Sequence, residues 1–165
     1  MLKNNFNSGA PLSVYSTLLI AFLLNVLPLG NHPWVPDFLM IVMAYWLLFS
    51  PQKISLALAF FLGLVMDVQT SSYLGMHGFS YVLLTFLIIF WHRRLSSLPP
   101  FGQMLQMFPI LLAVHFSLIT LYWVIFSHWY FSFAYIIFPS LVELLILTCL
   151  RGLLKNPSST SYNRA

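Results

Sequence analysis

The sequence is poor in charged residues. Only 6% of its 165 residues are charged, and only three are acidic. Soluble domains usually carry about a quarter charged residues. With 60% hydrophobic residues, the chain has too little charge to cover a water-facing surface. The composition therefore excludes an ordinary soluble domain and predicts a chain embedded in a lipid bilayer, without a separate extramembrane domain.

Other features that the sequence lacks exclude whole classes of function. The single Cys149 excludes an intrachain disulfide. The five histidines are dispersed over separate segments, which argues against a metal site. Neither an HExxH nor a GxSxG pattern occurs, and the few, scattered basic residues do not suit a phosphate backbone. We expect no catalytic site, no metal, no cofactor and no nucleic-acid partner.

Long apolar runs predict an all-α integral membrane protein. A spanning helix needs about 20 mainly apolar residues. We predict a single polytopic domain over residues 1–155 and a polar, disordered tail over 156–165. The six predicted spans cover residues 12–29, 36–50, 54–68, 74–91, 104–126 and 131–154. The second and third are short, and they form either a hairpin that does not fully cross or two short helices in a thinned bilayer.

The placement of basic residues predicts the orientation. With the N-terminus inside the cell, all seven Lys and Arg residues fall on the cytoplasmic side: Lys3, Lys53, Arg93, Arg94, Arg151, Lys155 and Arg164. The opposite loops, around Asn31, Ser71 and His128, contain none. This is the positive-inside pattern. It predicts that both termini are cytoplasmic, and Lys53 favours six crossings.

Two of the three acids lie near the predicted ends of short spans. Asp37 follows Pro36 and is expected either to cap the second span or to contact a partner. Asp67 lies four residues after Gly63, on the same helical face. The polar stretch 69–78 after it is placed to fold back and donate backbone amides to Asp67. Two interpretations of Asp67 stay open, a structural organiser and a binding residue for a partner or ligand.

The third acid lies within an apolar segment. Glu143 falls near the middle of the sixth span and His115 near the middle of the fifth, and these spans run antiparallel. The two residues are therefore at similar depth, and we predict a hydrogen bond between them. Such a polar pair serves packing specificity or, alternatively, a proton relay or a counter-charge for a ligand.

An ordered set of motifs runs through the second and third spans. It consists of Pro36-Asp37-Phe38, Tyr45-Trp46, Pro51, Gly63 followed at four residues by Asp67, and Leu74-Gly75. This order and spacing resemble the bacterial rod shape-determining MreD family, which also has similar length, six-span hydropathy and minimal loops. The C-terminal half is similar by hydropathy alone, so the resemblance assigns no role to His115 or Glu143.

The resemblance implies a non-enzymatic scaffold of the cell-wall elongation complex in the bacterial inner membrane. Its implied partners are membrane lipids and a bitopic MreC-like protein and, indirectly, a RodA-type glycosyltransferase, its transpeptidase and the MreB filament. The alternative is a small-molecule-binding transporter subunit, similar to the substrate-binding subunits of vitamin transporters, with a pocket near the outer face.

The motif residues are expected to form one partner-binding or fold-organising surface at the outer end of spans two to four. Asp67 and Gly75 are its expected organisers, and Tyr45 and Trp46 its packing residues. The full set is Pro36, Asp37, Tyr45, Trp46, Gly63, Asp67, Leu74 and Gly75.

Overall fold

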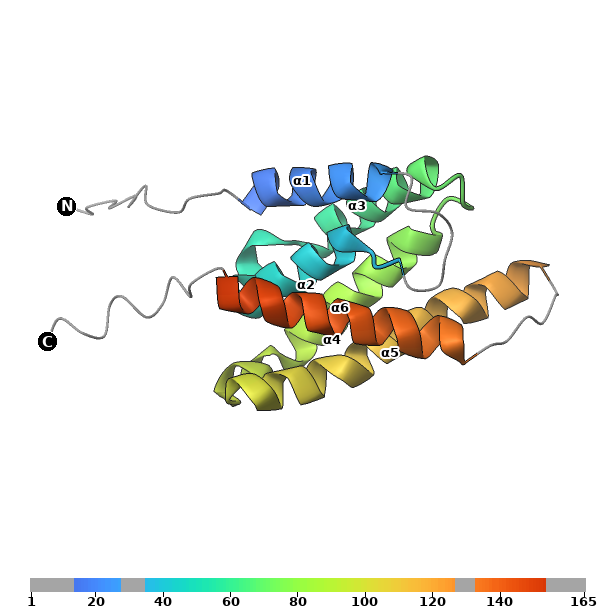
Figure 1. Cartoon of the computed structure of the whole chain (residues 1–165). Coiled ribbons are helices and arrows are strands. Elements are labelled where there is room, and N and C mark those ends of the chain that lie inside the picture. The colour runs from blue at the N-terminus through green and yellow to red at the C-terminus, as the bar shows by residue number, and fades with distance from the viewer. Residues whose placement is uncertain (1–13, 28–34, 127–132, 154–165) are drawn as a thin grey trace, which may run out of the picture.

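The computed structural model describes residues 14–27, 35–126 and 133–153, and within these ranges the regular secondary structure is all helical (Figure 1). The elements are α1 (Val14–Val26), α2 (Phe38–Phe49), a short 3-10 helix η1 (Pro51–Lys53), α3 (Leu56–Gln69), α4 (Met76–Ser97), α5 (Pro100–Phe126) and α6 (Ala134–Leu153). Each of the six α-helices overlaps one predicted span. The expected tail 156–165, Lys3, Lys155, Arg164 and the loops around Asn31 and His128 lie outside the described residues.

The helices differ in their capacity to cross a bilayer. By length and composition α5 and α6 are apolar enough to do so, whereas α1, α2 and α3 are shorter apolar helices. The observed loop between α4 and α5 is shorter than the predicted loop between the fourth and fifth spans, because α4 continues to Ser97 and α5 begins at Pro100. Two consecutive prolines explain the sharp break. Pro100 disfavours helical backbone at Pro99, and its own ring suits the first position of a helix.

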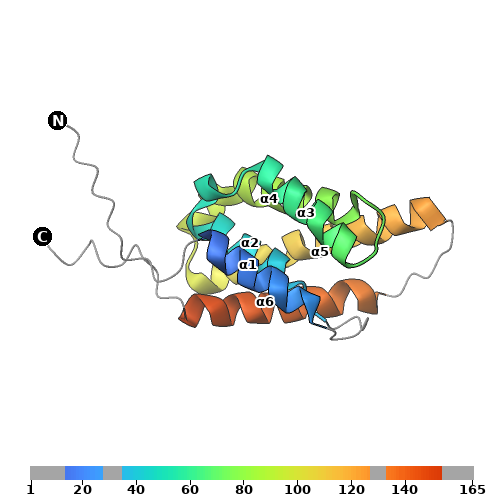
Figure 2. The ribbon, with the colours of Figure 1, turned by 90° about the horizontal axis from the view of Figure 1, so that it is seen from above.

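The second helix lies at the centre of the bundle. Figure 2 shows α3 and α4 on one side, α6 on the other and α2 between them, and α2 packs against α1, α4 and α6. Its buried residues are Leu39, Met40, Ile41, Met43, Ala44, Tyr45 and Leu47. Its 12 residues rise only about 18 Å, less than the roughly 30 Å of a hydrocarbon core. The N-terminal turn of α2 lies among the neighbouring helices, because Asp37 before it contacts side chains of α1, α4 and α6.

Basic residues gather at one end of the bundle. The C-terminal ends of α2, α4 and α6 lie together in Figure 1, and they carry or adjoin Lys53, Arg93, Arg94 and Arg151. The loop between α3 and α4 lies at the opposite end. The positions of these four residues agree with the charge pattern of the sequence.

Two glycines bring α3 and α4 into backbone contact. A Cβ atom added at Gly63 would lie 2.4 Å from both the N and the Cα of Gly78. No real Cβ approaches another backbone so closely, so a side chain at this position must push the two helices apart. Gly63 is therefore required for the close packing of the hairpin.

Gly63→Ala is expected to destabilise the protein by about 1–3 kcal/mol, the usual cost of overpacking a core. The measurement is thermal unfolding in detergent. Gly102→Ala is the matched control, because a Cβ there meets only side-chain atoms, the nearest 3.3 Å away at Leu98. Equal unfolding temperatures for the two variants would contradict the close approach of α3 and α4.

Candidate functional site

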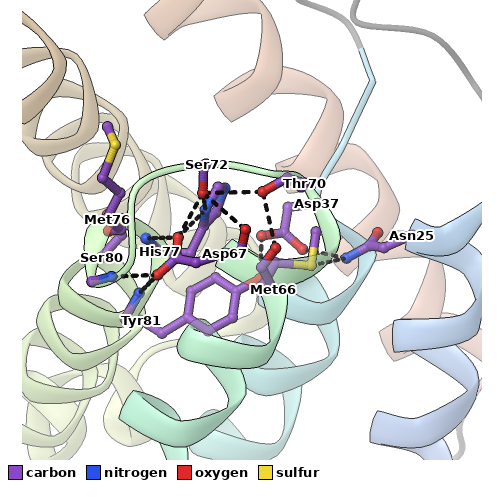
Figure 3. Close-up of polar contacts among 12 residues, drawn as sticks. Asn25, Asp37, Met66, Asp67, Thr70, Ser72, Met76, His77, Ser80 and Tyr81 are labelled. Atoms are coloured by element: carbon purple, nitrogen blue, oxygen red, sulfur yellow. Dashed lines mark hydrogen bonds and ion pairs between the residues drawn. The ribbon is translucent and has the colours of Figure 1, made fainter. Parts of the chain in front are cut away.

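The Asp67 carboxylate organises the loop between α3 and α4 (Figure 3). Asp67 is fully buried. It accepts hydrogen bonds from Ser72 Oγ (2.9 Å), the amides of Gly75 (2.7 Å), His77 (2.9 Å) and Gly78 (3.5 Å), and His77 Nδ1 (2.8 Å). The loop thus folds back over the end of α3, with its donors directed at a single side chain.

This arrangement caps α4 from a neighbouring helix. The first amides of a helix have no partner within the helix and need an acceptor. The N-cap of α4 is Gly75, which has no side chain to supply one, and its backbone is left-handed (φ +102°), a conformation that glycine adopts readily. Asp67 supplies the acceptor in its place, and its negative charge also suits the positive end of the helix dipole.

A second polar cluster surrounds the start of α2. The Asp37 carboxylate accepts from the Met40 amide (3.1 Å), so Asp37 is the N-cap of α2. It also accepts from Asn25 Nδ2 of α1 (2.8 Å) and from the Tyr81 hydroxyl of α4. Asn25 Oδ1 in turn accepts from the Phe38 amide (2.9 Å). The side chain of Asn25 therefore binds both the cap and the first backbone amide of α2.

The third acid joins the same cluster. The Asp37 amide donates to Glu143 Oε1 (3.4 Å), and His115 Nε2 lies 3.5 Å from the same oxygen. Ser140 Oγ lies 3.3 Å from His115 Nδ1. Glu143 is 1% exposed, and its other oxygen, Oε2, has no hydrogen-bond partner among the described residues. The structure thus places His115 and Glu143 within reach of each other, at the start of α2.

Side chains from all six helices meet in this cluster, which we call the Asp37 network. It comprises Asn25 of α1, Asp37 at the start of α2, Gln69 of α3, Tyr81 of α4, His115 of α5 and Glu143 of α6. Gln69 joins through its amide, which donates to the Asn25 carbonyl (2.8 Å). Sequence reasoning missed Asn25 and Tyr81. Asn25 was detectable as the one amide side chain in the run 12–29.

The expected aromatic pair lies elsewhere, so a single surface for all motif residues was a wrong expectation. Trp46 Nε1 donates to Thr17 Oγ1 near the start of α1 (2.8 Å), and Lys53 Nζ lies 5.2 Å from the centre of the Trp46 ring. Tyr45 is buried against Trp46, with ring centroids 5.6 Å apart. Eight residues of helix separate Tyr45 from Asp37, a rise of about 12 Å. The pair therefore packs toward the basic end of the bundle.

The remaining motif residues border the loop end. Pro36 is partly buried next to the Asp37 cap, whereas Leu74 is 72% exposed in the α3–α4 loop. Among the described residues no group of three or more His, Cys, Asp or Glu side chains is placed to hold a metal ion. The site is therefore a buried polar framework beneath an exposed loop.

Comparison with known proteins gives a consistent result. The family model described as rod shape-determining protein MreD matches residues 8–156. A rod shape-determining protein MreD of Haemophilus influenzae is 37% identical over 68 residues. The aligned stretch covers 40% of this chain and 42% of that relative, less than half of its length. No solved structure matches the chain.

Asp67→Asn is expected to destabilise the protein by about 1–3 kcal/mol. The NH2 group of asparagine cannot accept a hydrogen bond, so backbone amides that bind the carboxylate stay buried without an acceptor. The measurements are thermal unfolding and hydrogen exchange of the amides of residues 75–78. Ser72→Ala, which removes one of the donors to Asp67, serves as the comparison and should cost less. Unchanged exchange in Asp67→Asn would contradict capping by the carboxylate.

Proposed function

The chain belongs to the MreD family of rod shape-determining proteins, and on that premise we propose that it is a non-enzymatic membrane scaffold that binds an MreC-like partner. Through that partner it acts on a RodA-type glycosyltransferase, its transpeptidase and the MreB filament. The family membership carries this proposal.

We propose that the six helices cross the inner membrane with both termini in the cytoplasm. Lipid-facing surface supports the crossing, because large apolar side chains such as Phe101 (78%), Phe90 (69%) and Leu105 (69%) are mostly exposed. The short α2 and α3 are accommodated by a locally thinner bilayer. The gathering of Lys53, Arg93, Arg94 and Arg151 at one end supports a cytoplasmic position for that end.

We propose that the partner's single transmembrane helix docks on the outer face of α3 and on the loop beyond it. Phe61 (64%), Val65 (48%) and Val68 (71%) follow one another at helical spacing and are exposed. Leu74 continues this apolar stripe into the loop that Asp67 orders. A loop held in one conformation loses little entropy on binding. Asp67 is then an organiser of the surface and does not itself touch the partner, because it is fully buried.

Purification of the tagged chain from its native membranes in mild detergent tests this function. The wild type should recover an MreC-like protein together with wall synthases. Leu74→Ala should reduce that recovery several-fold, because the few residues that dominate an interface each cost more than about 1 kcal/mol when truncated, and we place Leu74 among them. Leu145→Ala on α6 is the matched control, since this leucine is 66% exposed far from the proposed surface and its loss should change nothing.

Cell shape gives the second readout of the same prediction. Asp67→Ala should lower recovery of the partner and round the cells, because the docking loop loses its anchor. Normal rods with an intact complex would remove Asp67 from the mechanism. Recovery of an ATPase pair in place of an MreC-like protein would contradict the scaffold and favour a transporter subunit.

A further inference from the structure

A groove opens between α2, α5 and α6 at the basic end of the bundle. It is a shallow depression with a cavity volume of about 20 Å³, and it is open to the surroundings. Its walls are mainly apolar, and they include Phe49 of α2, Met104 and Met107 of α5, and Leu147 of α6. Unbranched methionine side chains adapt to irregular apolar ligands. The walls therefore suit a flexible hydrocarbon chain.

Arg151 lines the groove and has no acidic partner. Among the described residues its guanidinium donates to Gln103 Oε1 (2.6 Å) and lies 5.7 Å from the centre of the Phe49 ring, and both contacts are neutral. All three acids of the chain are used elsewhere, in the Asp67 cap and the Asp37 network. The two ion pairs among the described residues join only histidines to carboxylates.

An unpaired cation beside an apolar groove attracts an anion. A guanidinium has five donors arranged for two-point binding of phosphate, and a charge next to hydrocarbon is costly unless it finds a partner. Lys53 and Arg93 at the same end add to the positive potential. The complementary ligand thus carries a negative head and a hydrocarbon tail.

We propose that this groove binds an anionic phospholipid. The lipid phosphate takes the free donors of Arg151 beside Gln103, and one acyl chain lies over the partly exposed Leu48, Phe49 and Met104. This site is distinct from the proposed partner surface on α3, and its lipid would lie on the surface of α2, α5 and α6 at the proposed cytoplasmic leaflet. The inference therefore goes beyond the scaffold function and can succeed or fail without it.

Lipid titration of the purified full chain in a nonionic detergent tests the proposal. Phosphatidylglycerol and phosphatidylcholine with identical acyl chains are compared by native mass spectrometry and by the rise in unfolding temperature. We expect about a tenfold preference for phosphatidylglycerol, equivalent to about 1.4 kcal/mol. Arg151→Gln should abolish the preference. Arg94→Gln removes the same charge from an exposed position at the same end and should retain it.

A second variant tests the groove without changing any charge. Met104→Trp fills the space beside Arg151 and should weaken phosphatidylglycerol binding about tenfold or more, a loss of about 1.4 kcal/mol. Unfolding temperatures without lipid establish that each variant is folded. Unchanged lipid binding by Met104→Trp would overturn the site even if Arg151→Gln failed to fold.

Three further results would overturn the proposal. Equal binding of the two lipids would show that no anionic head is recognised. An equal loss in Arg94→Gln and Arg151→Gln would show diffuse electrostatic attraction. Sodium phosphate that displaces phosphatidylglycerol at matched ionic strength would show a site for a free anion.

Discussion

The fold depends on the carboxylate at the start of α2. Asp37 caps its own helix and binds Asn25 of α1 and Tyr81 of α4, and its amide reaches Glu143 of α6. In the bilayer position proposed for these helices water is scarce, and each polar group left without a partner costs several kcal/mol. Separating the helices would expose them all together. The Asp37 network therefore fixes which helices meet, while the apolar side chains around it fill the space.

At the loop end of the bundle, Asp67 likewise gives buried polar groups their hydrogen-bond partners. It satisfies the first amides of α4, and the contact of Gly63 with Gly78 holds that helix against α3. The α3–α4 loop exposes Leu74, and hydrogen bonds to Asp67 hold the backbone of this loop in one conformation. The fully buried Asp67 and the partly buried Asp37 thus hold an exposed surface of this small chain in one conformation. That rigidity suits the proposed scaffold, which has little mass outside the membrane with which to grip a partner.

Composition and local spacing predicted much of this molecule, because a chain with three acids leaves each acid few options in lipid. The six helical segments, the contact of Asp67 with its loop and the proximity of His115 to Glu143 follow from periodicity and antiparallel depth. The contact between Asp37 and Glu143 could not be predicted in this way, because the two residues are 106 apart in sequence. It depends on the depth in the bundle at which the short α2 begins. The sequence analysis placed Tyr45 and Trp46 near Asp67, but motifs that are close in sequence can lie at opposite ends of the bundle, as these do.

A double-mutant cycle between Asp37 and Tyr81 tests the central role of the Asp37 network most directly. Asp37→Ala, Tyr81→Phe and the double variant are compared by reversible unfolding in detergent. Hydrogen bonds between membrane helices average about 0.6 kcal/mol and reach about 1.7. The buried Tyr81 hydroxyl donates a hydrogen bond to the Asp37 carboxylate, and we expect a coupling free energy near the upper value. A coupling of zero, with fully additive losses, would contradict the account.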